Sequence, residues 1–198
     1  GYVNPDEKTF SYIKNRLCAP PIENWDKAIK WWQSLKSDKN SVYDDVIKLD
    51  ASNIEPTVTW GITPGQSVGI NQKIPLLDEL HPNDQFIAEE AYEYMGFKPG
   101  QSIKDTPIDV CFIGSCTNGR ISDLRTAAKV LKHKKVSKKV KAFVVPGSEK
   151  VAMEAKKEGL DKIFKDAGFQ WREPGCSMCL AMNPDKLIGN QVSASSSN

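Results

Sequence analysis

The sequence lacks several features that mark whole classes of protein. None of its 198 residues belongs to an apolar run long enough to span a bilayer, so no membrane-spanning helix is expected. A net charge of only +2 makes no case for a dedicated nucleic-acid binder. The first residues, 1–5, have no signal-peptide character, and five cysteines at irregular spacing do not suggest a disulfide framework. We therefore expect a reducing compartment, the cytoplasm or, in a plant or alga, the plastid stroma.

The composition is that of a globular chain with one main domain. Hydrophobic residues make up 39% of the sequence and charged residues 26%, which is typical of folded proteins rather than disordered or membrane proteins. The length suffices for one domain with a real core and a smaller appendage. We find no internal repeat, and the serine-rich end at 193–197 is the one biased tract.

The first forty residues predict two helices. Pro5 and the acidic residues after it open the first, which ends before the proline pair at 20–21. Asn24 is a plausible N-cap for the second, whose apolar stripe includes Trp31 and Trp32. The tryptophans are expected to pack in a core rather than to bind a ligand.

From residue 41 onward the pattern predicts an α/β domain. Strands are expected at 42–49 and 56–60, and a helix at 84–95. Short apolar runs then alternate with helical patterns: strands at 108–113, 142–145 and 169–171, and helices at 122–131, 149–158 and 160–166. Such alternation implies a mostly parallel sheet flanked by helices, a three-layer α/β fold.

Two candidate loops follow strands of this predicted sheet. Cys116 comes directly after the strand at 108–113, and the Pro146-Gly147-Ser148 turn comes after the strand at 142–145. Ligands of parallel sheets gather beyond the carboxyl ends of the strands, so both loops are expected to face one crevice. Ser148 is predicted to cap the following helix rather than to bind a substrate carboxylate.

Three cysteines occur where metal ligands are expected. Cys116 lies in the string GSCTNG, between a strand and a helix, and Cys176 and Cys179 form a Cys-x-x-Cys pair. A helix N-terminus favours a thiolate, which is the metal-binding form of cysteine. Three thiolates are one ligand short of a closed zinc site or a fully ligated iron–sulfur cluster. The open position permits Lewis-acid catalysis on a bound substrate.

The residues around these cysteines fit such a site. Gly114 and Gly119 let the backbone approach a bulky inorganic group without a side-chain clash. Ser115, Thr117 and Asn118 carry groups that can donate hydrogen bonds to sulfur or to substrate. Arg120 either faces the substrate or forms surface pairs at the start of the next helix.

Spacing alone leaves three interpretations open: a zinc site, an iron–sulfur cluster, or no metal. A Cys-x-x-Cys pair is also typical of a redox dithiol, and Cys116 could be a buried apolar residue. His133 could complete a zinc site of three cysteines and one histidine, but its lysine-rich surroundings favour a solvated side chain. Cys18 and Cys111 are interpreted as structural.

Several strings resemble the aconitase superfamily: FIGSCTNGR at 112–120, VVPGS at 144–148 and PGCSMCLAMN at 174–183. VTWG at 58–61, TPGQ at 63–66 and GFQWR at 168–172 are similar, more narrowly, to large subunits of its isopropylmalate isomerase branch, the 3-isopropylmalate dehydratases. The resemblance runs along essentially the whole chain.

The resemblance implies that Cys116, Cys176 and Cys179 hold a 4Fe-4S cluster and that Asn198 lies beside it. The fourth iron, free of protein ligands, would act as a Lewis acid on the hydroxyl and a carboxylate of the substrate. The implied hydro-lyase reaction interconverts 2- and 3-isopropylmalate by dehydration and rehydration, in leucine biosynthesis. Homoaconitase or a related hydro-lyase is the alternative within the family. A non-catalytic zinc-binding module built on the same three cysteines is the alternative outside it.

The departures from the family pattern concern the rest of the machinery. Family members begin upstream of Gly1 with His- and Asp-bearing motifs for acid–base chemistry, and continue past Asn198 with an arginine segment. We therefore expect no catalytic acid or base here, and an isolated chain without activity. Residues 1–40 are expected to be the tail of a preceding domain, 41–198 to be the cluster domain, and a small subunit to be the partner.

Overall fold

The computed structural model describes residues 2–181 and 183–197. The chain divides into two compact units, residues 1–54 and 55–198. The sequence-based division at residues 40 and 41, with a tail of a preceding domain before it, stays a prediction. No helix in the described part of the chain is both long and apolar enough to cross a membrane.

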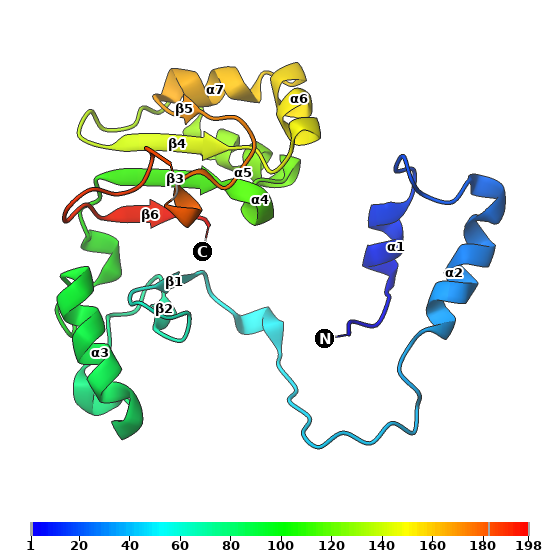
Figure 1. Ribbon diagram of the computed structural model, residues 1–198, viewed down its shortest axis with the longest axis horizontal. Helices are drawn as coiled ribbons and strands as arrows, with labels where there is room; N and C mark the ends of the chain where they lie inside the picture. The colour runs from blue at the N-terminus through cyan, green and yellow to red at the C-terminus, as the bar shows by residue number, and fades with distance from the viewer. Residues whose placement is uncertain (1, 182, 198) are drawn as a thin grey trace. The chain divides into compact units, whose positions relative to one another are not determined.

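The first unit contains the two predicted helices. They are α1, Glu7–Ile13, and α2, Trp25–Ser34 (Figure 1). Asp6 caps α1 by accepting a hydrogen bond of 2.8 Å from the Thr9 N–H. Trp32 stacks on Phe10 and meets Trp25 edge-on, which confirms that Trp32 packs against other residues. The same prediction is wrong for Trp31, whose side chain is 62% exposed.

The strand predicted at 42–49 is wrong. This stretch forms no strand in the structure, and its apolar side chains are exposed, with Val42 96% and Ile47 85% accessible. β-branched residues favour a strand only where a neighbouring strand and a buried face receive them, and no described residue supplies either here.

The second unit begins with a two-stranded antiparallel sheet of β1, Thr57–Thr59, and β2, Ser67–Gly69. Helix α3, Pro82–Met95, follows and ends at Gly96 in the left-handed conformation. A small core joins these elements, where Trp60 stacks on Tyr92 with 5.1 Å between ring centres.

A four-stranded parallel sheet carries the rest of the unit. Its strand order is β5-β4-β3-β6, and its members are β3, Val110–Gly114, β4, Lys141–Val145, β5, Gln170–Trp171, and β6, Ser193–Ser195. Four helices connect the strands: α4, Ser115–Asn118, α5, Ile121–Leu131, α6, Glu149–Lys157, and α7, Leu160–Ala167. A parallel sheet flanked by helices confirms the predicted α/β class.

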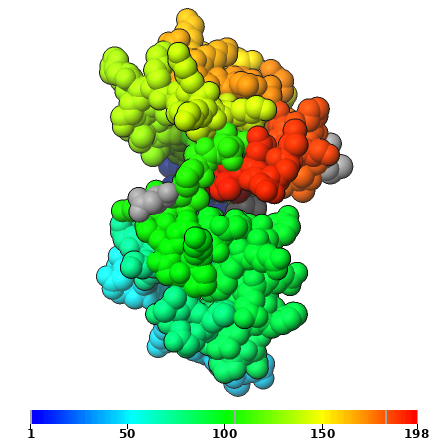
Figure 2. All heavy atoms as spheres, turned by 90° about the vertical axis from the view of Figure 1, so that its left-hand side faces the viewer, coloured from blue at the N-terminus to red at the C-terminus, as the bar shows by residue number. Residues whose placement is uncertain are grey.

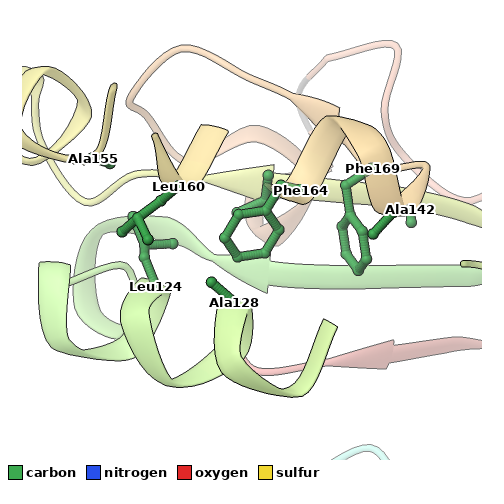
Figure 3. Close-up of a cluster of buried hydrophobic side chains, with 9 residues drawn as sticks. Leu124, Ala128, Ala142, Ala155, Leu160, Phe164 and Phe169 are labelled. Atoms are coloured by element: carbon green, nitrogen blue, oxygen red, sulfur yellow. The ribbon is translucent and has the colours of Figure 1, made fainter. Parts of the chain in front are cut away.

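The two faces of this sheet are covered differently. Ala142 and Val144 of β4 point into the larger core, which α5, α6 and α7 close (Figure 3). Phe112 and Phe143 point to the opposite face, where Met178 packs against them. Met178 belongs to the short 3-10 helix η5, Ser177–Leu180, so the segment with the Cys-x-x-Cys pair lies over this second face.

The serine-rich end is a strand, which the sequence did not predict. β6 pairs in parallel with β3, with Val110 opposite Ser193 and Phe112 opposite Ser195. Small polar side chains give no strand signal, yet the buried neighbour β3 provides the pairing partner. The C-terminal residues, coloured red, form part of the surface in the space-filling view (Figure 2).

Candidate metal centre

Cys116 lies where β3 turns sharply into α4. Gly114 ends the strand with φ +107°, and a Cβ there would stand 2.0 Å from the carbonyl oxygen of Val145. Ser115 follows in the left-handed region with φ +76° and is almost fully buried. A left-handed residue other than glycine is sparsely populated and is maintained by its surroundings. The turn brings Cys116 to the surface, where its side chain is exposed.

A second close approach joins this turn to the loop after β4. The Gly147 N–H donates a 2.8 Å hydrogen bond to the Gly119 carbonyl, and a Cβ on Gly119 would lie 2.7 Å from the Gly147 nitrogen. The loops after β3 and β4 therefore abut, as their positions at strand ends predicted. The Ser148 side chain accepts a hydrogen bond from the Val151 N–H, so it caps α6 as expected.

The cysteine pair sits at the start of η5. The Cys179 N–H donates to the Cys176 carbonyl at 3.1 Å, which closes a tight turn between the two residues. Both side chains are exposed, in contrast to Met178 between them, which packs on the sheet. A Cβ on Gly175, which precedes the pair, would meet nothing within 4 Å.

The hydroxyl of Ser115 connects Cys116 to the pair. Its oxygen lies 3.5 Å from the sulfur of Cys179 and 3.8 Å from the sulfur of Cys116, so its one hydrogen can be donated to either sulfur. Sulfur is a weak and large acceptor, so these lengths are within its hydrogen-bond range. A buried side chain of the turn after β3 thus contacts thiols from two distant parts of the sequence.

The surroundings shift the pKa of two thiols in opposite directions. Hydrogen bonds from the hydroxyls of Thr117 and Ser115 lower the pKa of Cys116 and so favour its thiolate. The Cys179 thiol raises the pKa of Cys176, first through a hydrogen bond with the neutral thiol and then through repulsion between the two negative charges, and Cys116 adds a smaller effect in the same direction. The three thiols are therefore close enough to influence one another's ionisation.

The positions of the three thiols are compatible with a cluster. In the described part of the chain, no group of three or more His, Cys, Asp or Glu side chains is gathered so as to hold one metal ion. Cysteines that ligate a cluster bind to different irons, so their sulfurs need not converge on one point. Exposed thiols on two facing loops, tied by the Ser115 hydroxyl, fit that requirement.

The C-terminal strand closes one side of the site. The Ser196 hydroxyl accepts a 3.0 Å hydrogen bond from the Gly114 N–H. The main-chain N–H of Ser196 donates to the Phe112 carbonyl. The Asn118 side chain donates to the Ser196 carbonyl. The sequence did not predict these contacts, because a serine-rich segment lacks the periodic hydrophobic pattern that indicates a strand. Asn198, the fourth predicted site residue, lies outside the described residues.

The other histidines and cysteines differ in their surroundings. His133 is exposed, as its lysine-rich surroundings indicated. His81, directly before Pro82, caps α3 by accepting from the Asn83 N–H. Cys111 is half-buried, and burial raises the pKa of its thiol, which fits a structural role. Cys18 is exposed, so its structural interpretation is wrong.

The aconitase family model, described as "Aconitase family (aconitate hydratase)", matches residues 1–198. The chain belongs to the aconitase family. A 3-isopropylmalate dehydratase large subunit from Prochlorococcus marinus (strain MIT 9312) is 86% identical over the whole chain, which covers 42% of that relative. Relatives of the same name and coverage from Nostoc punctiforme and Rippkaea orientalis are 67% and 66% identical. The chain spans about two fifths of the length of the curated relatives it matches.

Proposed function

We propose that this chain is the cluster-bearing part of the large subunit of an isopropylmalate isomerase. In the complete protein it would interconvert 2- and 3-isopropylmalate by dehydration and rehydration, a hydro-lyase step of leucine biosynthesis. The observation that carries the proposal is the contact of Ser115 with both Cys116 and Cys179, which supports one centre for the two cysteine motifs. The substrate is proposed from the name of relatives that are up to 86% identical, the 3-isopropylmalate dehydratase large subunits.

The residues that would hold a 4Fe-4S cluster are Cys116, Cys176 and Cys179, with Asn198 beside it. When bound, such a cluster supplies an iron without a protein ligand, a Lewis acid for the hydroxyl and a carboxylate of the substrate. The lowered pKa of Cys116 favours its thiolate, the form that binds iron. The Ser115 hydroxyl lies within hydrogen-bond distance of two of the sulfurs and can donate to either.

The loops that carry the cysteines also shape the site around the substrate. The 2.8 Å hydrogen bond between Gly147 and Gly119 keeps the two loops beyond β3 and β4 in contact. Arg120 is exposed directly after Gly119, and its N–H rather than its side chain bonds Asp123. Its guanidinium is therefore available for a substrate carboxylate. We assign no catalytic acid or base to this chain.

Activity would require further polypeptide. We propose that the rest of the large subunit and a small subunit contribute the proton-transferring groups, and that the complex works in the cytoplasm. Measurable turnover of isopropylmalate by the isolated chain after anaerobic reconstitution would contradict the proposal that other polypeptide contributes the proton-transferring groups.

The test is anaerobic reconstitution of the full-length large subunit with iron and sulfide, followed by addition of the small subunit. We expect brown absorbance at about 400 nm, from iron–sulfur charge transfer, and turnover of 2-isopropylmalate. Cys116→Ser is the matched loss-of-ligand variant, and Cys18→Ser is the control, since Cys18 is exposed and not part of the centre. Uptake of zinc without iron, or turnover of homoaconitate in place of isopropylmalate, would overturn the assignment.

A further inference from the structure

The segment that leads from β5 to the cysteine pair is fastened to the sheet at Arg172. Its N–H donates a 2.9 Å hydrogen bond to the Val144 carbonyl of β4. The carbon at the centre of its guanidinium lies 4.9 Å from the centre of the Phe143 ring, a cation–π contact. Arg172 is thus held by both its main chain and its side chain, shortly before Cys176.

Asp185 closes the loop from the other end. Its carboxylate accepts hydrogen bonds from Arg172 Nε at 3.0 Å and Arg172 Nη2 at 2.5 Å, a bidentate pair of defined geometry. The Asp185 side chain is only 13% exposed. Residues 172 and 185 are thereby clamped together, with the cysteine pair on the loop between them.

Ser177 connects the Arg172–Asp185 pair to the cysteine pair. This residue stands between Cys176 and Cys179, and its hydroxyl donates a 2.9 Å hydrogen bond to the same carboxylate oxygen, Oδ2, that Arg172 Nε bonds. One carboxylate therefore connects the base of the loop to the residue beside the first thiol.

The backbone conformation of this loop indicates that the hydrogen bond from Ser177 to Asp185 restrains it. Ser177, the first residue of η5, has φ +48°, and Ala181, directly after η5, has φ +51°, so both are left-handed. This conformation is unfavourable for an L-residue with a side chain. Such conformations persist only where the surroundings impose them. The Ser177 side chain is tied down by Asp185, which opposes relaxation of the loop.

We propose that Arg172, Asp185 and Ser177 form a positioning network that sets the directions of the Cys176 and Cys179 thiols for the cluster. The inference rests on the proposed function for the identity of the bound group. None of the three is a ligand; they act through the loop. Partners of ligands fix ligand geometry in other metal sites, where their loss weakens metal affinity about 10- to 100-fold.

The test uses the full-length large subunit with two variants, Asp185→Asn and Ser177→Ala. Asp185→Asn keeps the side-chain size but removes the charge and an acceptor, and Ser177→Ala removes one hydroxyl. Glu158→Gln is the matched control, because Glu158 also accepts two hydrogen bonds from an arginine, Arg125, on the opposite, helix-covered side of the sheet. Two measurements are made: the rate at which a chelator removes iron, and the alkylation rate of each cysteine in the metal-free protein.

We expect iron to leave Asp185→Asn about 10-fold faster than wild type, a smaller acceleration in Ser177→Ala, and no change in Glu158→Gln. In the metal-free protein, alkylation of Cys176 and Cys179 should change in the first two variants, with Cys18 as the internal reference. Equal iron-loss rates in Ser177→Ala and wild type, together with equal alkylation rates, would overturn the network.

The two measurements also separate this inference from the proposed function. If the wild type takes up no iron, the proposed function fails, and the alkylation rates alone decide whether the network orients the thiols. If Asp185→Asn does not fold, Ser177→Ala decides, because it removes only a hydroxyl from a half-buried position.

Discussion

Gly119 and Gly147 approach so closely that Gly119 has no room for a side chain. The Gly147 N–H donates a 2.8 Å hydrogen bond to the Gly119 carbonyl, and a Cβ on Gly119 would stand 2.5 Å from the Ser115 carbonyl oxygen. The contact joins the loop with Cys116 to the loop after β4, so the position of Cys116 depends on the neighbouring strand.

Gly119→Ala should therefore destabilise the domain. The added methyl group would meet three backbone atoms closer than 3.0 Å, so the two loops would have to separate. We expect a loss of about 1–3 kcal/mol in the free energy of unfolding, measured by denaturant titration. Gly65→Ala is the control, because the nearest atom to its Cβ would be 3.8 Å away. Equal stability of the two variants would contradict the close approach.

Ser115→Ala should make the Cys116 thiol harder to ionise. The Ser115 hydroxyl is one of two that lower the pKa of Cys116, so its removal should move the midpoint of the alkylation-rate profile of Cys116 to higher pH. Thr117→Val should act in the same direction on Cys116. Only Ser115→Ala should also alter the alkylation of Cys179, since the Ser115 hydroxyl contacts that sulfur. Identical effects of both variants on Cys179 would argue against the bridging hydroxyl.

Ser196→Ala should weaken the attachment of the C-terminal strand. The substitution removes the acceptor of the Gly114 N–H, and a typical hydrogen bond contributes about 0.5–1.5 kcal/mol. Hydrogen exchange at Gly114 should accelerate accordingly. Ser193→Ala serves as the control, because the Ser193 side chain has no hydrogen bond among the described residues. Unchanged protection of Gly114 would show that the strand is held by its main chain alone.

The Arg125–Glu158 pair should make stability depend on acid pH. Hydrogen bonds from Arg125 lower the pKa of Glu158 below its ordinary value of 4.5, so ionised Glu158 stabilises the folded state. This contribution is fully present above the ordinary value and is lost as the pH falls through the lower folded-state value. Wild type should therefore exceed Glu158→Gln in stability at neutral pH, with the difference vanishing in acid. A difference independent of pH would exclude the ion pair as its source.

The α/β class and the alternation of strands and helices could be predicted from the sequence, because buried strands such as β3 and amphipathic helices such as α5 carry strong periodic patterns. The cysteine motifs were equally visible. The sequence could not reveal β6, whose serines gain order only from pairing with β3. The strand expected at 42–49 fails for the opposite reason: a strong local preference finds no partner among the described residues.

The connections around Ser115 and Ser177 could not be predicted either. Both depend on contacts between side chains that are far apart in the sequence. Both also depend on left-handed backbone at a serine, a residue type that does not predict this conformation. The string GSCTNG indicated a close approach of backbone, but not that its serine would reach Cys179.

The pairing of β3 with β6 has a consequence for biosynthesis. The contact of Gly114 with Ser196 spans 82 residues, so β3 leaves the ribosome long before its neighbour exists. The Cys116 turn can reach its final form only after β6 has been translated and has docked. The proposed cluster would then be loaded after both strands have been made, rather than during the synthesis of this segment.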